Sequence, residues 1–149
     1  MVEDFDSFFD RIYEKFRGSQ GWMLFPETFG VLKQLKNIGL KLGIISNFDS
    51  RIYSVLESLG IRDLFDAVTI SSETGYPKPN REIFEAAVRA LSVPASSVLL
   101  VGDSPDDDVL PAIRAGLSAV LIDRRDRQAA RTQLRRITSL TDVLSEVTS

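Results

Sequence analysis

Three short stretches of the chain carry side chains that suit chemistry on a phosphate group. An acidic cluster, Asp103 with Asp106–Asp108, follows one apolar run, Ser46 ends another, and Lys78 lies between two prolines. Carboxylates hold hard cations such as Mg²⁺, whereas a hydroxyl, an ammonium and backbone N–H groups hold anions. If the fold brings the three stretches together, they suit a magnesium ion beside a phosphate.

The composition narrows the chemistry further. The 149 residues include no Cys and no His, which excludes thiolate nucleophiles, Cys-ligated metals and every Ser-His or Cys-His pair. The formal charge of −3 argues against a nucleic-acid binder. No apolar run approaches the roughly 20 residues of a membrane helix, and the acidic start is unlike a secretory signal. We therefore expect a cytoplasmic protein with no nucleic-acid or membrane partner.

The elements that must position these side chains alternate between strand and helix. We expect strands over 40–45, 67–70, 98–101 and 119–122, and helices over 50–59, 81–91 and 106–115. This alternation predicts an α/β fold, with a three-layer, doubly wound and mostly parallel sheet. Ligands of such sheets bind at the carboxyl ends of the strands. Ser46 and Asp103 both fall at such ends.

The flanking segments carry weaker patterns. The spacing of phenylalanines predicts a helix over 5–16. A second helix should begin near Pro26, and its apolar face is expected to contain Phe29, Leu32, Leu35 and Ile38. The tail 124–136 holds six arginines and should be a solvated, partly helical surface, and a last helix is expected near Ser139.

The three chemical stretches resemble motifs of the haloacid dehalogenase superfamily, whose members are mostly aspartate-nucleophile phosphatases. The second motif, a hydroxyl at a strand end, is matched by Ile45-Ser46-Asn47, and the third by Lys78-Pro79 ahead of a helix. The fourth, an acidic pair after a strand, is matched by Gly102-Asp103 with Asp108. The motifs occur in family order over about residues 25–123.

The resemblance implies hydrolysis of a small phosphorylated metabolite, with phosphate as product. An Asp would attack phosphorus to form an aspartyl-phosphate, which water then cleaves. Ser46 and the Asn47 backbone amide would hold the phosphoryl group, and Lys78 would neutralise its charge. The resemblance thus makes two residues that contact the phosphoryl group and two acids the expected catalytic residues: Ser46, Lys78, Asp103 and Asp108.

The resemblance also implies Mg²⁺ as cofactor. Asp103 would bind the ion directly, and Asp108 would lie behind it, with Asp107 as the alternative second acid. The ion would offset the repulsion between an attacking carboxylate and the phosphate.

The chain departs from the family at the first motif, Asp-x-Asp-x-Thr or Val after an apolar strand. The only candidate is Asp4-Phe5-Asp6-Ser7, which three residues precede. We interpret residues 1–20 as the last helix of a cap domain and 22–149 as the α/β core, without its usual central first strand and most of the cap. Two strands would then pair directly, or a homodimer or a second chain would fill the gap. Turnover is expected to be very slow or absent.

Simpler interpretations stay open beside this one. Asp103 could be a helix cap, Ser46 a turn hydroxyl and Lys78 a solvated loop lysine. The scaffold could also serve as a non-catalytic interaction module. A receiver domain of two-component signalling is disfavoured, because Lys78 precedes Asp103 whereas that fold expects a Lys after its phosphoacceptor Asp.

Overall fold

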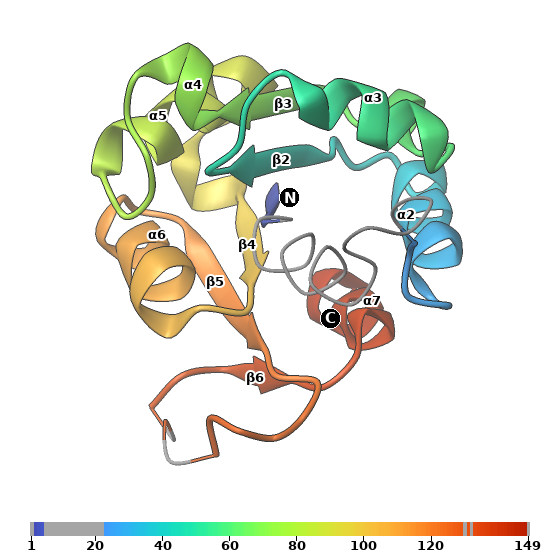
Figure 1. Cartoon of the computed structure of the whole chain (residues 1–149). Helices are drawn as coiled ribbons and strands as arrows, with labels where there is room; N and C mark the ends of the chain where they lie inside the picture. The colour runs from blue at the N-terminus through green and yellow to red at the C-terminus, as the bar shows by residue number, and fades with distance from the viewer. Residues whose placement is uncertain (1, 5–22, 130, 132, 149) are drawn as a thin grey trace.

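A fully parallel sheet of six strands forms the centre of the molecule. The computed structural model describes residues 2–4, 23–129, 131 and 133–148 (Figure 1). The strands are β1 (Val2–Asp4), β2 (Gly43–Ser46), β3 (Ala67–Ile70), β4 (Leu99–Gly102), β5 (Ser118–Ile122) and β6 (Arg136–Ile137). Their order in the sheet is β3-β2-β1-β4-β5-β6, and every neighbouring pair is parallel. This order confirms the α/β fold expected from the alternating pattern.

Helices cover both faces of this sheet. They are α2 (Thr28–Asn37), α3 (Arg51–Ser58), α4 (Ser71–Thr74), α5 (Arg81–Leu91), α6 (Leu110–Arg114) and α7 (Val143–Thr148). Between them the described residues form four short helical turns, namely η1 (Arg62–Leu64), η2 (Ala95–Ser97), η3 (Pro105–Val109) and η4 (Leu140–Asp142). Of these turns, η3 is a π-helix. Figure 1 shows α5 and α6 together on one side of the sheet and α2 and α7 on the other.

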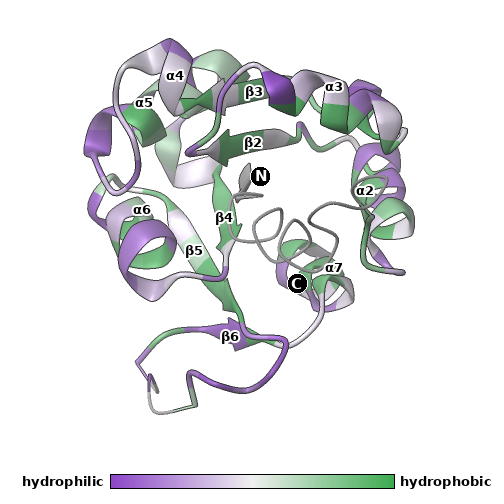
Figure 2. Cartoon of the chain, viewed as in Figure 1, coloured by the Kyte–Doolittle hydropathy of each residue, from purple (hydrophilic) through white to green (hydrophobic). Residues whose placement is uncertain are grey.

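Successive strand residues point into two separate cores. Ile44 packs with α2, α3 and α7, while its neighbour Ile45 packs with α5 and α6. Val101 and Leu100 divide in the same way, because successive side chains of a strand point to opposite faces. In Figure 2 the apolar colour is concentrated on the strands and on the inward faces of the helices. Burial on both faces explains why these strands are continuously apolar in sequence.

Several expected elements differ from those observed. Helix α2 buries Val31 beside Leu32 and Leu35, whereas Phe29 and Ile38 are 47% and 54% exposed. The helix expected over 106–115 is divided into η3 and α6. The tail 124–136 leads into β6, which adds a sixth parallel strand by pairing with β5.

The largest correction concerns the centre of the sheet. We expected the first strand to be missing, with the gap closed or filled by another chain, but β1 lies between β2 and β4. Val2 pairs with Gly43 on one side and with Leu100 on the other. β1 pairs with three residues of β2 and with two of β4, because a strand contributes backbone N–H and C=O groups whatever its side chains. A homodimer stays a prediction.

The expected cap helix lies outside the described residues. Residues 5–22 are not described, so the helix over 5–16 and the domain boundary near residue 20 stay predictions. None of the helices in the described part is both long and apolar enough to cross a membrane.

Candidate functional site

Ser46 provides a buried hydroxyl at the carboxyl end of β2. The residue is 0% exposed, and its Oγ has no hydrogen-bond partner among the described residues. Leaving a buried polar group unpaired costs about 1–3 kcal/mol, so such a group calls for an explanation. An anion that accepts a hydrogen bond from this hydroxyl supplies one.

Lys78 reaches the same edge of the sheet from the loop between α4 and α5. Its Nζ lies 2.9 Å from Oδ1 of Asp108, and the two side chains are 1% and 0% exposed. The other oxygen of Asp108, Oδ2, accepts a hydrogen bond from the Ser104 backbone N–H at 3.0 Å. Lys78 is thus not a solvated loop lysine, because a buried charge must be paired and hydrogen-bonded to be tolerated.

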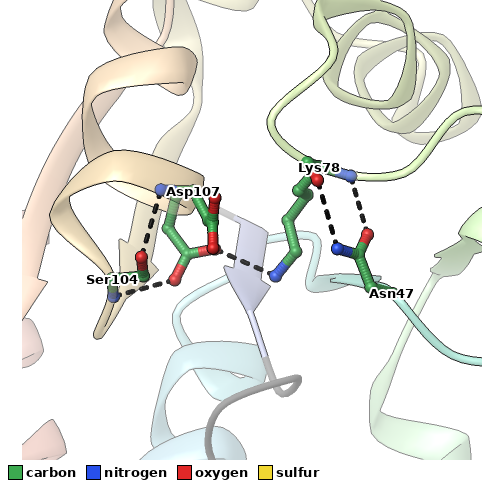
Figure 3. Close-up of polar contacts among 5 residues, drawn as sticks. Asn47, Lys78, Ser104 and Asp107 are labelled. Carbon is green, nitrogen blue, oxygen red and sulfur yellow. Dashed lines mark hydrogen bonds and ion pairs between the residues drawn. The ribbon is translucent and has the colours of Figure 1, made fainter.

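Asn47 fixes the backbone that carries this lysine. Its side-chain amide donates to the Lys78 carbonyl oxygen at 3.2 Å, and its Oδ1 accepts from the Lys78 N–H at 2.7 Å. In Figure 3 Lys78 lies between Asn47 and the loop that bears Ser104 and Asp107. The residue after Ser46 therefore joins the end of β2 to the lysine loop.

The loop after β4 brings Asp108 back against the strand. A Cβ added to Gly102 would lie 2.5 Å from the Asp108 Cβ, so only glycine permits this approach. Ser104 caps the start of η3, and its Oγ accepts a hydrogen bond from the Asp107 N–H at 3.1 Å. A π turn is wider than an α turn, and such turns are frequent at functional sites. Here it buries Asp108 and leaves Asp107 exposed.

The acids fit Mg²⁺ only in part. No group of three acidic side chains suited to a metal ion occurs among the described residues. Both oxygens of Asp108 already have partners, Asp107 is exposed, and Asp103 is half-buried in the loop after β4. Mg²⁺ often uses one or two carboxylates together with substrate phosphate oxygens, a pattern that this chain can meet. Metal binding by Asp103, Asp107 and Asp108 stays a prediction.

Another acid at this edge of the sheet, Asp123, holds the loop after β5 through hydrogen bonds. Oxygens of Asp123 accept from the backbone N–H groups of Arg127 at 2.9 Å and Gln128 at 2.7 Å. Burial alone would raise the pKa of Asp123, but these two N–H groups and the Arg136 guanidinium lower it below its ordinary value. Asp123 is therefore a structural anion next to the site.

Among the residues singled out in the sequence, Lys78 contacts two others directly: it is hydrogen-bonded to Asn47 and paired with Asp108. Ser46 is adjacent to Asn47 in the chain, and Asp103 follows β4 at the same edge. The candidate nucleophile motif contains two acids, Asp4 and Asp6. Asp4 is the last residue of β1 and pairs with Ile45 of β2, whereas Asp6 lies outside the described residues. Sequence reasoning missed the contacts of the Asn47 side chain, for which the signal was an Asn next to a predicted site residue. It also missed the turn that begins at Ser104, for which the signal was Ser-Pro ahead of a run of acids.

The chain is similar to known proteins in both sequence and fold. The family model described as "haloacid dehalogenase-like hydrolase" matches residues 2–116. Over 123 residues the chain is 34% identical to haloacid dehalogenase-like hydrolase domain-containing protein 3 of Danio rerio, covering 83% of this chain and 51% of that protein. It is 39% identical over 108 residues to glyceraldehyde 3-phosphate phosphatase of Methanothermobacter thermautotrophicus, covering 72% and 48%.

The fold agrees as well. The crystal structure of a HAD phosphatase from Thermococcus onnurineus superposes with a TM-score of 0.81 at 25% identity, covering 97% of this chain and 71% of that one. The chain spans about half the length of the two curated relatives described above, 51% and 48%. The family match over more than half of the chain, together with this sheet and these motifs, shows that the chain belongs to the haloacid dehalogenase-like hydrolases.

Proposed function

We propose that the chain is a phosphate-ester hydrolase core that binds a phosphorylated small molecule together with Mg²⁺. The observation that carries this proposal is the buried Ser46 hydroxyl, which has no partner in the described part of the chain. It lies at the end of β2, next to the residue that clamps Lys78. Two relatives of this chain, those from Methanothermobacter and Thermococcus, are named as phosphatases.

Each residue has a defined role in this proposal. The Ser46 hydroxyl donates to a phosphoryl oxygen, and the Lys78 ammonium offsets the negative charge of the group. Asp108 and Asn47 fix the lysine from its two ends, one through Nζ and one through the backbone. Fixed donors of this kind need no reorganisation when charge develops on the phosphoryl oxygens. Asp103 would hold Mg²⁺, which withdraws charge from the phosphate.

Turnover by this chain is proposed to be very slow or absent. The stretch that starts at the last residue of β1 reads Asp4-Phe5-Asp6-Ser7-Phe8, with Phe8 where the family pattern has Thr or Val. Asp4, the first acid of this stretch, is the last residue of β1 and pairs with Ile45 of β2, so an attacking carboxylate here would depend on the position of β1. A misplacement of about 1 Å can cost 100-fold in rate.

A non-catalytic phosphate-binding module is the second candidate. It is favoured by Asp108, whose oxygens are both occupied by Lys78 and Ser104. Under this alternative the same residues bind phosphate and no ester is cleaved. Cytoplasmic residence remains a prediction under either candidate.

Hydrolysis of p-nitrophenyl phosphate with and without MgCl₂ tests the proposal. We expect inorganic phosphate to bind in the presence of Mg²⁺ and release of p-nitrophenol to stay at least 100-fold below the rates of about 10 s⁻¹ typical of enzymes. Fast release that Asp103→Ala and Asp4→Asn both abolish would show that the nucleophile is in place. Failure of phosphate to bind at all would refute both candidates.

A further inference from the structure

A pocket of about 150 Å³ lies at the carboxyl edge of the sheet, beside the proposed phosphate site. Its lining contains two acids and three arginines, and comprises Asp103, Ile122, Asp123, Arg124, Arg125, Arg127 and Gln128. In the sheet, Asp103 follows β4, which lies between β2 with Ser46 and β5 with this segment. The pocket, here called the arginine pocket, therefore lies on the far side of Asp103 from Ser46.

The segment that forms the arginine pocket is held in one shape. The Asp123 carboxylate accepts from two successive backbone N–H groups, those of Arg127 and Gln128. Asp126 closes the turn, donating its N–H to the Asp123 carbonyl at 3.2 Å. An ion pair of 3.3 Å between Arg131 and Asp106 ties the following residues to η3. A loop ordered before a ligand arrives loses little entropy on binding.

The charges of the arginine pocket are only partly matched within the protein. Arg124 pairs with Glu27 and lies 3.8 Å from the centre of the Phe25 ring. Arg125 and Arg127 are exposed, and no ion pair joins either guanidinium to an acid in the described ranges. Two cations of the pocket thus lack an acidic partner among the residues that the structure describes.

We infer that the arginine pocket binds a carboxylate of the substrate, which would then be a small phosphate ester that also carries a carboxylate. This inference rests on the proposed function. With its phosphate at Ser46 and Lys78, such an ester would extend past Asp103 toward the arginine pocket, which Asp103 also lines. The planar guanidinium group matches a carboxylate with two parallel hydrogen bonds, and the small volume favours a carboxylate over a larger anion.

Two probes of similar size test the inference: 3-phosphoglycerate, and glycerol 3-phosphate, in which a hydroxymethyl group replaces the carboxylate. Their dissociation constants are measured by calorimetry with MgCl₂ at fixed ionic strength, so slow turnover does not affect the result. The wild type should bind 3-phosphoglycerate about tenfold more tightly, the gain expected of a charge-assisted contact.

The double variant Arg125→Gln/Arg127→Gln should lose this preference, with the affinity for glycerol 3-phosphate unchanged. Arg89→Gln is the control, since Arg89 is an exposed arginine of α5 outside the pocket. Equal affinities in the wild type, or a preference that survives in the double variant, would overturn the inference and leave the proposed function standing. If neither probe binds, the proposed function fails and the inference fails with it.

Discussion

Two ion pairs at the same edge of the sheet differ sharply in their surroundings. Lys78 and Asp108 meet at 2.9 Å with side chains 1% and 0% exposed. Arg136 lies 3.4 Å from Asp123 and 2.8 Å from Asp126, and its own side chain is 30% exposed. The first pair joins two loops across the site, while the second lies at the margin of the sheet.

The difference teaches which charges the fold depends on. Water screens an exposed pair and competes for its hydrogen bonds, so the pair contributes at most about 1 kcal/mol. A buried pair stabilises only while both partners are present, because the loss of one leaves an uncompensated charge in the interior. We therefore expect stability to be far more sensitive to change at the Lys78 loop than at β6.

Replacing Lys78 should have the largest effect. The variant Lys78→Met leaves the Asp108 carboxylate buried without its cation, which should lower the free energy of unfolding by about 3–5 kcal/mol. Urea denaturation measures this loss. Adding Asp108→Asn to the same chain should restore most of it, since no charge then remains unpaired. Losses that simply add in the double variant would show that the two side chains are not coupled.

Crowding the same region should have the next largest effect. Gly102→Ala places a Cβ 2.5 Å from the Asp108 Cβ and should cost about 1–3 kcal/mol. Gly30→Ala is the matched control, because Gly30 lies within α2 with nothing near its added methyl group. That change should stabilise the protein by about 0.5–1 kcal/mol. Equal effects of the two substitutions on thermal unfolding would contradict the close approach of Asp108.

The margin of the sheet should respond to pH. The pKa of Asp123 is lower in the folded protein than its ordinary value of 3.8, so its contribution is fully present above that value. The contribution is lost as the pH falls through the lower, folded-state pKa. Asp123→Asn should therefore cost about 1 kcal/mol at pH 7 and progressively less as the pH falls below 3.8. A cost that does not shrink as the pH falls would mean that charge is not what holds this loop.

The smallest effect is expected from Arg136→Gln. The two contacts that it removes are partly exposed, so the loss should be about 0.2–1 kcal/mol and should shrink in 1 M NaCl. Chemical denaturation at low and high salt measures this change. A loss as large as that of Lys78→Met would remove the distinction between the two regions.

The sequence predicted those parts of the fold that have a strong local pattern. Continuous apolar runs marked β2, β3, β4 and β5, because each is buried on both faces. Strands β1 and β6 have three and two residues, which is too short for periodicity to register. The face of α2 was misjudged at Phe29 and Ile38, since spacing alone cannot show how far the neighbouring layer extends.

The candidate site was predictable as a set of residues but not as a set of contacts. Ser46, Lys78 and Asp103 were singled out because the carboxyl ends of parallel strands meet at one edge, and their roles stay predictions. The pairing of Lys78 with Asp108 depends on how the π turn returns to Gly102, which no spacing rule reveals. The Asn47 side chain was missed for the same reason, because it acts across two loops.

The most direct measurement of the central claim combines stability and phosphate binding in Ser46→Ala. If the buried hydroxyl is kept for an anion, its removal should leave the free energy of unfolding unchanged or raise it by about 1 kcal/mol. The dissociation constant of inorganic phosphate with MgCl₂ should rise about tenfold, because one donor is lost. A destabilised variant that binds phosphate as tightly as the wild type would show that the hydroxyl serves the fold, and the proposed site would be wrong.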